Sequence, residues 1–240
     1  MPTRTPSAPN AAGTAQISLS DQAYFMIRES ILRGQVRPGT VFSRRKLAEE
    51  FGMSFLPISE ALQRLENDGL VESRPRAGTR VRVPSTEEIR GRYVVREALE
   101  AQSARLCCER ATFEERLELR RMAEQLDTLF ARAESADTEF QFVVHTHHHE
   151  LHLRIAEFAR CRELKQAIEK NHVLIYNWFY DVAAERRSLP PHFHADLVKH
   201  ITGGDIPAAD EAMRRHVQYG LPDLLDRIVP DTAGEWRLRR

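Results

Sequence analysis

The spacing of hydrophobic residues changes from a helical to a strand period within residues 44–83. Gly52 lies where a first short helix would end, because glycine readily adopts the left-handed conformation of a helix end, and Ser54 is placed to cap a second helix. Hydrophobic and basic residues then alternate on the strand side of Ala77-Gly78-Thr79, which predicts a β-hairpin with its turn at these three residues. Two short helices followed by a hairpin are the order of a winged helix-turn-helix. The two helical stripes are Leu47, Ala48 and Phe51, and Ile58, Ala61, Leu62 and Leu65.

The rest of the chain keeps a helical period. Ser85 or Thr86 can cap a new helix ahead of Glu87 and Glu88, and apolar stripes then continue to Val229. Strand signals are absent after residue 83. We therefore predict a mostly α protein, an N-terminal winged helix-turn-helix plus a C-terminal all-α helical bundle of about six or seven helices. The expected breaks are residues 111–112, 135–137, 190–191 and 203–204.

Composition divides the chain into four parts. Residues 1–18 are rich in Pro, Ala, Ser and Thr and are expected to be disordered; residues 19–84 form the winged helix, 85–230 the helical domain and 231–240 a C-terminal tail. The formal charge of the whole chain is zero, but the first 84 residues carry +4 and the remainder −4. A mildly basic head on an acidic body suits a DNA-binding domain joined to a sensing domain.

Nothing in the sequence predicts export or a membrane anchor. The first residues lack the apolar core of a signal peptide, and no apolar run is long enough to cross a bilayer. The three cysteines, Cys107, Cys108 and Cys161, have neither the number nor the spacing of a disulfide framework or a cysteine zinc site. We expect a cytoplasmic protein.

Several polar and cationic side chains of the expected head are candidates for DNA contact. In this fold the second helix enters the major groove, and a basic wing reaches a neighbouring phosphate or the minor groove. The candidates are Arg44, Arg45, Lys46, Ser54, Phe55, Ser59, Arg64, Arg74, Arg76 and Arg80. The alternative is a winged helix used only for protein contacts.

All ten histidines lie after residue 144. His148 and His152 have the i, i+4 spacing at which two imidazoles can bind one metal ion, while His194 opens a later helix and His216 lies in the last one. On their own these residues leave two interpretations open: a metal site, or histidines that are solvated or buried with hydrogen-bond partners. One face of the expected helix carries His145, His148, His149 and His152.

Glycine and proline positions agree with a known family. The motifs are Ile31-Leu32-Arg33-Gly34, Arg37-Pro38-Gly39 and Asp68-Gly69-Leu70-Val71, and with their apolar spacing residues 19–83 resemble the N-terminal domain of GntR-type bacterial transcription regulators. The resemblance implies operator binding, with Arg45 at a basic family position. Where family members carry arginines that read guanine edges or phosphates, this chain has Phe55 and Ser59, and Phe55 could instead pack on a thymine methyl.

A second resemblance covers residues 92–229. Arg96-Glu97-Ala98-Leu99-Glu100, Leu151-His152 with Ile155-Ala156-Glu157, and His194 with Gly204-Asp205, Met213 and His216 resemble the signatures of the FCD-type helical sensing domain of the FadR-like subfamily. In metal-binding members of that subfamily, three histidines and one aspartate coordinate a divalent ion. The resemblance places the histidine ligands at His152, His194 and His216, and the aspartate position at His148.

The resemblance implies a metal and an effector. Four imidazoles would favour a divalent transition metal, zinc or nickel above all, over manganese, which prefers oxygen. The alternatives are a three-histidine site without His148, or a fourth ligand from His145 or His149. A small carboxylate effector is implied, with Arg96 as its candidate partner or, alternatively, as a salt-bridge residue. The candidate pocket aromatics are Tyr176, Trp178, Phe179 and Tyr180.

We therefore expect a homodimeric regulator, a repressor in preference to an activator, on a pseudo-palindromic operator. A first rival is a metal-free regulator that binds a larger apolar effector. A second is a metallohydrolase fused to a DNA-binding head. The second is disfavoured because the run from His148 to His152 lacks the His-Glu-x-x-His spacing that places a general base beside the metal.

Overall fold

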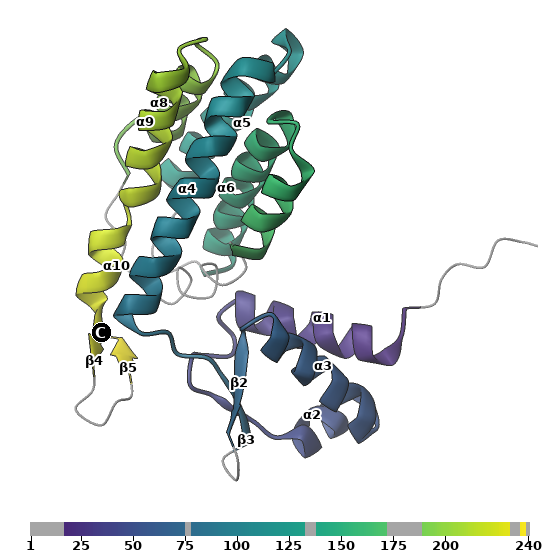
Figure 1. Cartoon of the computed structure of the whole chain (residues 1–240). Coiled ribbons are helices and arrows are strands. Elements are labelled where there is room, and N and C mark those ends of the chain that lie inside the picture. Colours follow the sequence, from purple (N-terminus) through teal and green to yellow (C-terminus); the bar gives the residue numbers. More distant parts are fainter. Residues whose placement is uncertain (1–16, 75–77, 133–137, 172–188, 231–235, 239–240) are drawn as a thin grey trace, which may run out of the picture.

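The computed structural model of the chain describes residues 17–74, 78–132, 138–171, 189–230 and 236–238. Figure 1 shows a small head built from the N-terminal elements and a larger helical domain that the long helix α4 enters from the head. Each part has its own hydrophobic core. The mostly α architecture agrees with the fold class predicted from the sequence.

The head is a winged helix-turn-helix. Its helices pack around buried residues such as Ile27, Ile58 and Leu62. Strand β3 lies between β1 and β2, antiparallel to both, with Val71 opposite Val81. The elements are α1 (Leu19–Leu32), β1 (Val41–Phe42), α2 (Arg44–Phe51), α3 (Phe55–Asn67), β2 (Val71–Arg74) and β3 (Gly78–Val81).

Local signals account for most helix ends of the head. Gly52 ends α2 in the left-handed conformation, with φ +62°, as predicted. Ser54 does stand at the N-cap position of α3, but its side chain makes no capping hydrogen bond, so that expectation was wrong. The exposed Ser54 hydroxyl is therefore not committed to its own helix.

The helical domain is built around α4. Ser85 caps α4 in a reciprocal capping box with Glu88, as the sequence predicted, and α4 then packs against α6, α8 and α9. Helix α5 packs against α6 and α8. The elements are α4 (Thr86–Arg110), α5 (Phe113–Arg132), α6 (Thr138–Phe158), a helix over 162–171, α8 (Phe193–Ile201), α9 (Ile206–Gln218) and α10 (Leu221–Arg227).

Two features after residue 200 differ from the sequence prediction. The apolar stripes expected to continue to Val229 are interrupted after Gln218, where α9 ends, and α10 begins as a separate helix at Leu221. The expectation of no strands after residue 83 was wrong, because β4 (Ile228–Pro230) pairs antiparallel with β5 (Trp236–Leu238), inside the segment expected to be a tail. Strands of three residues are too short to show a period of two.

The head and the helical domain touch at the start of α6. Arg33, at the end of α1, lies 2.5 Å from a carboxylate oxygen of Glu139, and its guanidinium sits 4.5 Å above the ring of Phe142. Arg82 and Glu88 form an ion pair across the linker into α4. Among the helices of the described residues, none is long and apolar enough to cross a membrane.

Candidate metal centre and DNA-binding surface

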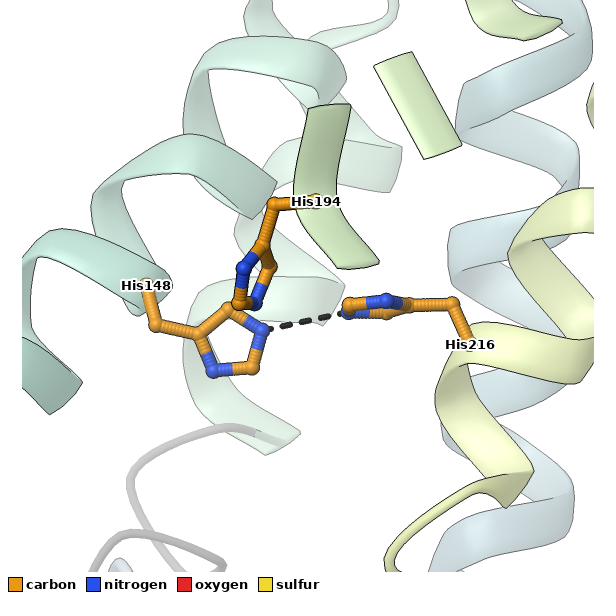
Figure 2. Close-up of side chains that lie close together, drawn as sticks. All are labelled: His148, His194 and His216. Atoms are coloured by element: carbon orange, nitrogen blue, oxygen red, sulfur yellow. Dashed lines mark hydrogen bonds between the residues drawn. The ribbon is translucent and has the colours of Figure 1, made fainter. Parts of the chain in front are cut away.

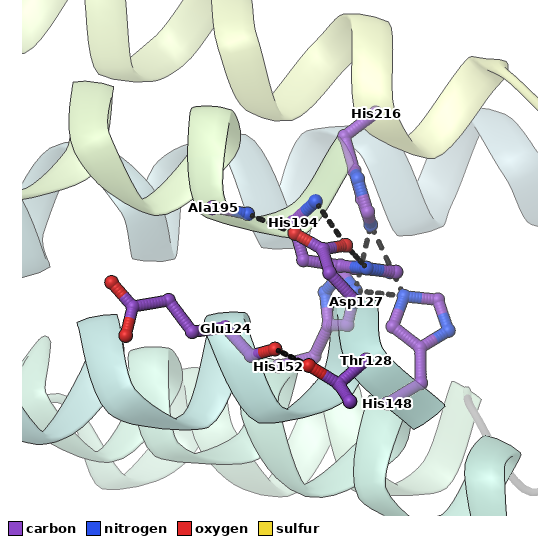
Figure 3. Close-up of polar contacts among 8 residues, drawn as sticks. All are labelled: Glu124, Asp127, Thr128, His148, His152, His194, Ala195 and His216. Carbon is purple, nitrogen blue, oxygen red and sulfur yellow. Dashed lines mark hydrogen bonds and ion pairs between the residues drawn. The ribbon is translucent and has the colours of Figure 1, made fainter. Parts of the chain in front are cut away.

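Four imidazoles converge inside the helical domain. His148 and His152 come from α6, His194 from the first turn of α8 and His216 from α9. Figure 3 shows the four rings turned toward one another, and Figure 2 shows those of His148, His194 and His216. Three of the four are buried, His194 completely, and His148 is half-buried. Neighbouring residues on the same helices, such as Leu151 and Met213, belong to the hydrophobic core, so core packing brings the histidines together.

The nitrogen atoms of these rings lie close together. Nε2 of His152 is 2.9 Å from Nε2 of His148 and 3.1 Å from Nε2 of His216, and the last two are 3.1 Å apart. Ring nitrogens of His148, His194 and His216 also all lie within 4.8 Å of one another. The two triads share His148 and His216, so contacts through these two rings link all four imidazoles.

Aromatic rings enclose the centre. Phe130 of α5 stacks on His194 with ring centroids 5.0 Å apart, and Phe193 of α8 stacks on His216 at 4.7 Å. Such rings restrict how far the imidazoles can rotate, so the donors are held in place before any ligand binds.

A buried carboxylate orients His152. Nδ1 of His152 lies 2.6 Å from Oε2 of Glu100, and Arg96 donates from Nε to Oε1 of the same carboxylate at 2.7 Å. All three side chains are almost completely buried. The contact with Glu100 places the proton of neutral His152 on Nδ1, so the lone pair of Nε2 faces the other imidazoles.

A second carboxylate positions His194. Asp127 of α5 accepts hydrogen bonds from Nδ1 of His194 at 2.7 Å and from the backbone N–H groups of His194 and Ala195 at 3.0 Å each (Figure 3). It therefore caps α8 from a neighbouring helix, while the side chain of the N-cap residue His192 makes no capping bond. The pKa of Asp127 lies below its usual value because these hydrogen bonds outweigh the opposing effect of burial.

The environment favours the neutral form of His148 and His216. Burial holds the pKa values of His148 and His216 well below the ordinary value, and repulsion from the neighbouring histidines lowers them further. A neutral imidazole is the form that binds metal. Ring nitrogens this close repel one another unless a shared proton or a cation lies between them.

The donor set fits a transition-metal ion. With metal–nitrogen bonds of about 2.0–2.1 Å, neighbouring ligand nitrogens lie roughly 2.9–3.4 Å apart, and the three Nε2 distances of 2.9–3.1 Å fall in this interval. Contacts from Glu100 and Asp127 to the far side of two ligand rings are the arrangement found around metal-bound histidines.

The remaining sequence candidates are placed elsewhere. His145 is buried with its ring against Phe130, 6.0 Å between centroids, and His149 is half-buried. Arg96, the candidate effector partner, is engaged by Glu100 in the salt bridge that was its alternative role. The candidate aromatics Tyr176, Trp178, Phe179 and Tyr180 lie outside the described residues.

Two site residues were missed by the sequence reasoning. Glu100 belongs to the signature segment that starts at Arg96, and its i, i+4 spacing from that arginine is a signal for the salt bridge. Nothing along the chain connects Glu100 with His152. Asp127 carries no local signal, because its partner His194 is 67 residues away.

Six of the DNA-binding candidates lie at the starts of helices α2 and α3. Arg44, Arg45 and Lys46 are exposed in the first turn of α2, and Arg45 pairs with Glu49 of its own helix, with 80% of its side chain exposed. At the start of α3, Ser54 and Phe55 are exposed and Ser59 is half-buried. These residues face solvent and can approach a duplex.

The other cationic candidates have partners inside the head. Arg64 lies 4.2 Å above the ring of Tyr24 and forms an ion pair with Asp21, both in α1, near the far end of α3. On the wing, Arg74 and Arg80 both contact Glu72. Arg76 lies outside the described residues. Arg64 and Arg80 would have to leave these partners to bind phosphate.

Comparison with known proteins agrees with this architecture. Residues 19–81 match the family described as bacterial regulatory proteins, gntR family, and residues 92–219 match the FCD domain. The chain belongs to the GntR family. It is a DNA-binding transcription regulator of that family with a C-terminal FCD domain, as the sequence resemblance implied.

Relatives of similar length are regulators of transcription. The HTH-type transcriptional repressor RspR of Escherichia coli is 26% identical over 204 residues, which is 83% of this chain and 86% of the relative. The Nta operon transcriptional regulator of Aminobacter aminovorans is 28% identical over 160 residues, covering 66% and 72%. These matches confirm the prediction that the GntR-family chain is a regulator and not an enzyme.

Solved structures share the fold. Escherichia coli McbR/YncC aligns with a TM-score of 0.70 at 20% identity, over 88% of this chain and 99% of that one. A putative GntR transcriptional regulator from Rhodococcus sp. RHA1 aligns with a TM-score of 0.70 at 18% identity, over 86% and 97%. The arrangement of head and helical domain is thus an established one.

Proposed function

We propose that this protein is a homodimeric repressor whose helical domain binds a divalent transition metal and a small carboxylate that together set its affinity for operator DNA. The observation that carries the proposal is the buried convergence of His148, His152, His194 and His216. The contacts of Glu100 and Asp127 support it, because each orients a ligand nitrogen toward the common point.

Zinc or nickel suits this donor set best. Imidazole ligands favour zinc, nickel and copper, whereas manganese prefers oxygen. His148 stands where metal-binding relatives carry an aspartate, so the substitution moves the preference further from manganese. Tetrahedral zinc would be saturated by four imidazoles. An ion with six positions would keep two for an effector, which favours nickel if the metal takes part in sensing.

A carboxylate is the effector class that the charges support. Arg96 and Glu100 neutralise each other, and Asp127 offsets only one of the two charges of the ion, so the loaded centre stays positive. Arg96 is held by Glu100 and would act on the effector indirectly, by orienting His152 through that carboxylate. The metal is then the direct partner of the effector carboxylate.

Two further parts of the proposal concern the dimer and the direction of regulation. A twofold dimer presents two heads to a pseudo-palindromic operator, and the small basic excess of one head favours two heads acting together. Repression agrees with the name of the relative RspR, a transcriptional repressor.

The effector signal has a structural route to the head. Helix α6 carries His148 and His152, and its first turns carry Glu139 and Phe142, which hold Arg33 of α1. A shift of α6 on metal or effector binding would therefore move a contact of the head. Binding can change DNA affinity only if it favours one arrangement of the heads over another.

Metal analysis of the full-length protein tests the proposal. We expect about one zinc or nickel ion per chain after purification without chelators, and almost none in the His152→Ala/His194→Ala variant. His147→Ala removes an exposed histidine from the same helix and is the matched control, which should keep the ion.

DNA affinity measured with and without a chelator, and with acetate, lactate or succinate, then separates sensing from structure. A metal-dependent change in operator affinity supports sensing. No bound ion after zinc and nickel have been added would overturn the metal site and leave a metal-free regulator with a larger apolar effector. A bound ion whose removal changes nothing, with no response to any acid, would overturn the sensing role.

A further inference from the structure

Two large apolar side chains stand exposed at the start of the helix that enters the major groove. Phe55 and Leu56, the first two residues of α3, have 58% and 67% of their surface exposed. Exposed side chains of this size placed next to each other indicate a binding surface. This surface belongs to the DNA-binding head of the GntR-family protein and does not depend on the metal centre.

The packing of α3 leaves these residues no place in the core. The buried stripe of α3 starts at Pro57 and Ile58, and residues 61, 62 and 65 continue it on the face toward α1. Phe55 and Leu56 precede the stripe and lie at the tip of the helix, beside the exposed Ser54. In a helix-turn-helix, the N-terminal residues of the recognition helix contact base edges.

The tip carries no charge that could read guanine. The first turn of α3 has no cationic residue, and the exposed cations Arg44, Arg45 and Lys46 lie at the start of α2. Cations on α2 suit phosphate contacts, which position the protein without reading sequence. Base recognition at the tip therefore falls to uncharged side chains, of which Phe55 and Leu56 are the large exposed ones.

The major groove offers one apolar feature to such a surface, the C5 methyl group of thymine. We propose that Phe55 and Leu56 read thymine methyl groups in each operator half-site, in place of a guanine contact by arginine. Ser54, whose hydroxyl is not used in capping, lies beside them and can bond to a neighbouring base edge.

Deoxyuridine substitution tests this proposal directly, because uracil pairs as thymine does and lacks only the methyl group. A bound sequence is first selected from a random duplex library with the full-length protein. Each thymine is then replaced singly, and affinity is measured by fluorescence anisotropy at constant salt. At least one replacement per half-site should weaken binding about fourfold, the factor that corresponds to burying one methyl group.

Variants show which side chains read the methyl group. In Phe55→Ala or Leu56→Ala the sensitive position should bind thymine and uracil alike. Phe25→Ala, which removes an exposed phenylalanine from α1, is the matched control and should keep the sensitivity of the wild type. Phe55→Arg should select guanine in place of thymine at that position.

The outcomes are distinct. If every deoxyuridine duplex binds the wild type as its thymine counterpart does, the proposal is overturned even where the alanine variants fail to fold. It is equally overturned if Phe55→Ala and Leu56→Ala both keep the full sensitivity. If no sequence is enriched in the selection, the specific DNA binding of the family has itself failed, and the metal centre stays untouched by either result.

Discussion

The two proposed functional regions of this protein are built in opposite ways. The proposed DNA-binding surface consists of neighbouring residues at the starts of α2 and α3, such as Arg45 and Phe55, which are exposed. The histidine centre is assembled from α6, α8 and α9, with supporting carboxylates from α4 and α5, and is buried. One residue of the exposed surface can be substituted without disturbing the others, whereas each residue of the buried centre is held by contacts with the other residues of the centre.

The free-energy cost of a substitution differs between the exposed surface and the buried centre. Exposed ion pairs such as Arg45 with Glu49 contribute at most about 1 kcal/mol to stability. Removing one partner from the Arg96–Glu100 pair would leave an uncompensated charge in the core, which costs about 3–5 kcal/mol. The head can therefore vary its DNA contacts cheaply, and the helical domain cannot vary its centre in the same way.

The largest effect is expected where a supporting carboxylate is changed. Asp127→Asn should weaken zinc or nickel binding about 10–100-fold, because an amide cannot accept hydrogen bonds at both of its terminal atoms from His194 and the α8 backbone. Calorimetric titration with the metal measures the change. Glu124→Gln, on the same helix and pointing away from the centre in Figure 3, is the control. Unchanged affinity in Asp127→Asn would show that the carboxylate only caps α8.

A smaller effect is expected at the contact between the head and the helical domain. Glu139→Gln should reduce the metal-dependent change in DNA affinity about fivefold or more, while metal binding itself stays unchanged, because Arg33 loses its charged partner on α6. Glu29→Gln removes the partner of Arg33 within α1 and is the matched control. A full response in Glu139→Gln would exclude this contact as the route.

On the DNA surface, Arg45→Ala should weaken binding several-fold for all sequences alike. The salt dependence of the affinity should fall by about one unit of slope, because one phosphate contact is lost. Affinities measured over a range of salt concentrations with the selected and a random duplex show this. Sequence-dependent loss would instead assign Arg45 to base recognition.

The smallest effect is expected for the capping box of Ser85 and Glu88, at the start of α4 between the head and the helical domain. Burial alone would raise the pKa of Glu88, but the hydrogen bonds from Ser85 and the charge of Arg82 bring it below the ordinary value of 4.5. A carboxylate with a lowered pKa adds stability above its unfolded pKa and loses it as pH falls through the folded pKa. Glu88→Gln should therefore cost about 0.5 kcal/mol at pH 7, a small value because 38% of the side chain is exposed and solvent screens its charge.

Thermal unfolding of the wild type and Glu88→Gln at several pH values tests this. The difference in stability should be constant above pH 4.5 and shrink below it. A difference that stays the same down to pH 3 would mean that the carboxylate charge contributes nothing.

Sequence reasoning succeeded where the deciding residues are close along the chain. The end of α2 at Gly52, the capping box of Ser85 and Glu88, and the pairing of His148 with His152 on one helix face all depend on spacings of a few residues. The same reasoning overestimated Ser54 as a cap, because the N-cap position does not decide the rotamer of the serine hydroxyl.

It missed the contacts that only packing creates. Glu100 meets His152 because α4 packs on α6, and Asp127 meets His194 because the end of α5 faces the start of α8. The hairpin of β4 and β5 was missed because pairing, and not a local period, defines such short strands.

The sequence by itself determined the elements, the two-part organisation and the family, since hydrophobic period, glycine positions and capping residues act within a few residues along the chain. It also supplied the imidazoles and the unusual Phe55. Tertiary structure alone decided that His194 and His216 meet the pair on α6, that Arg96 is bound by Glu100, and that Phe55 and Leu56 stay outside the core. These outcomes depend on how whole helices pack, which no local spacing encodes.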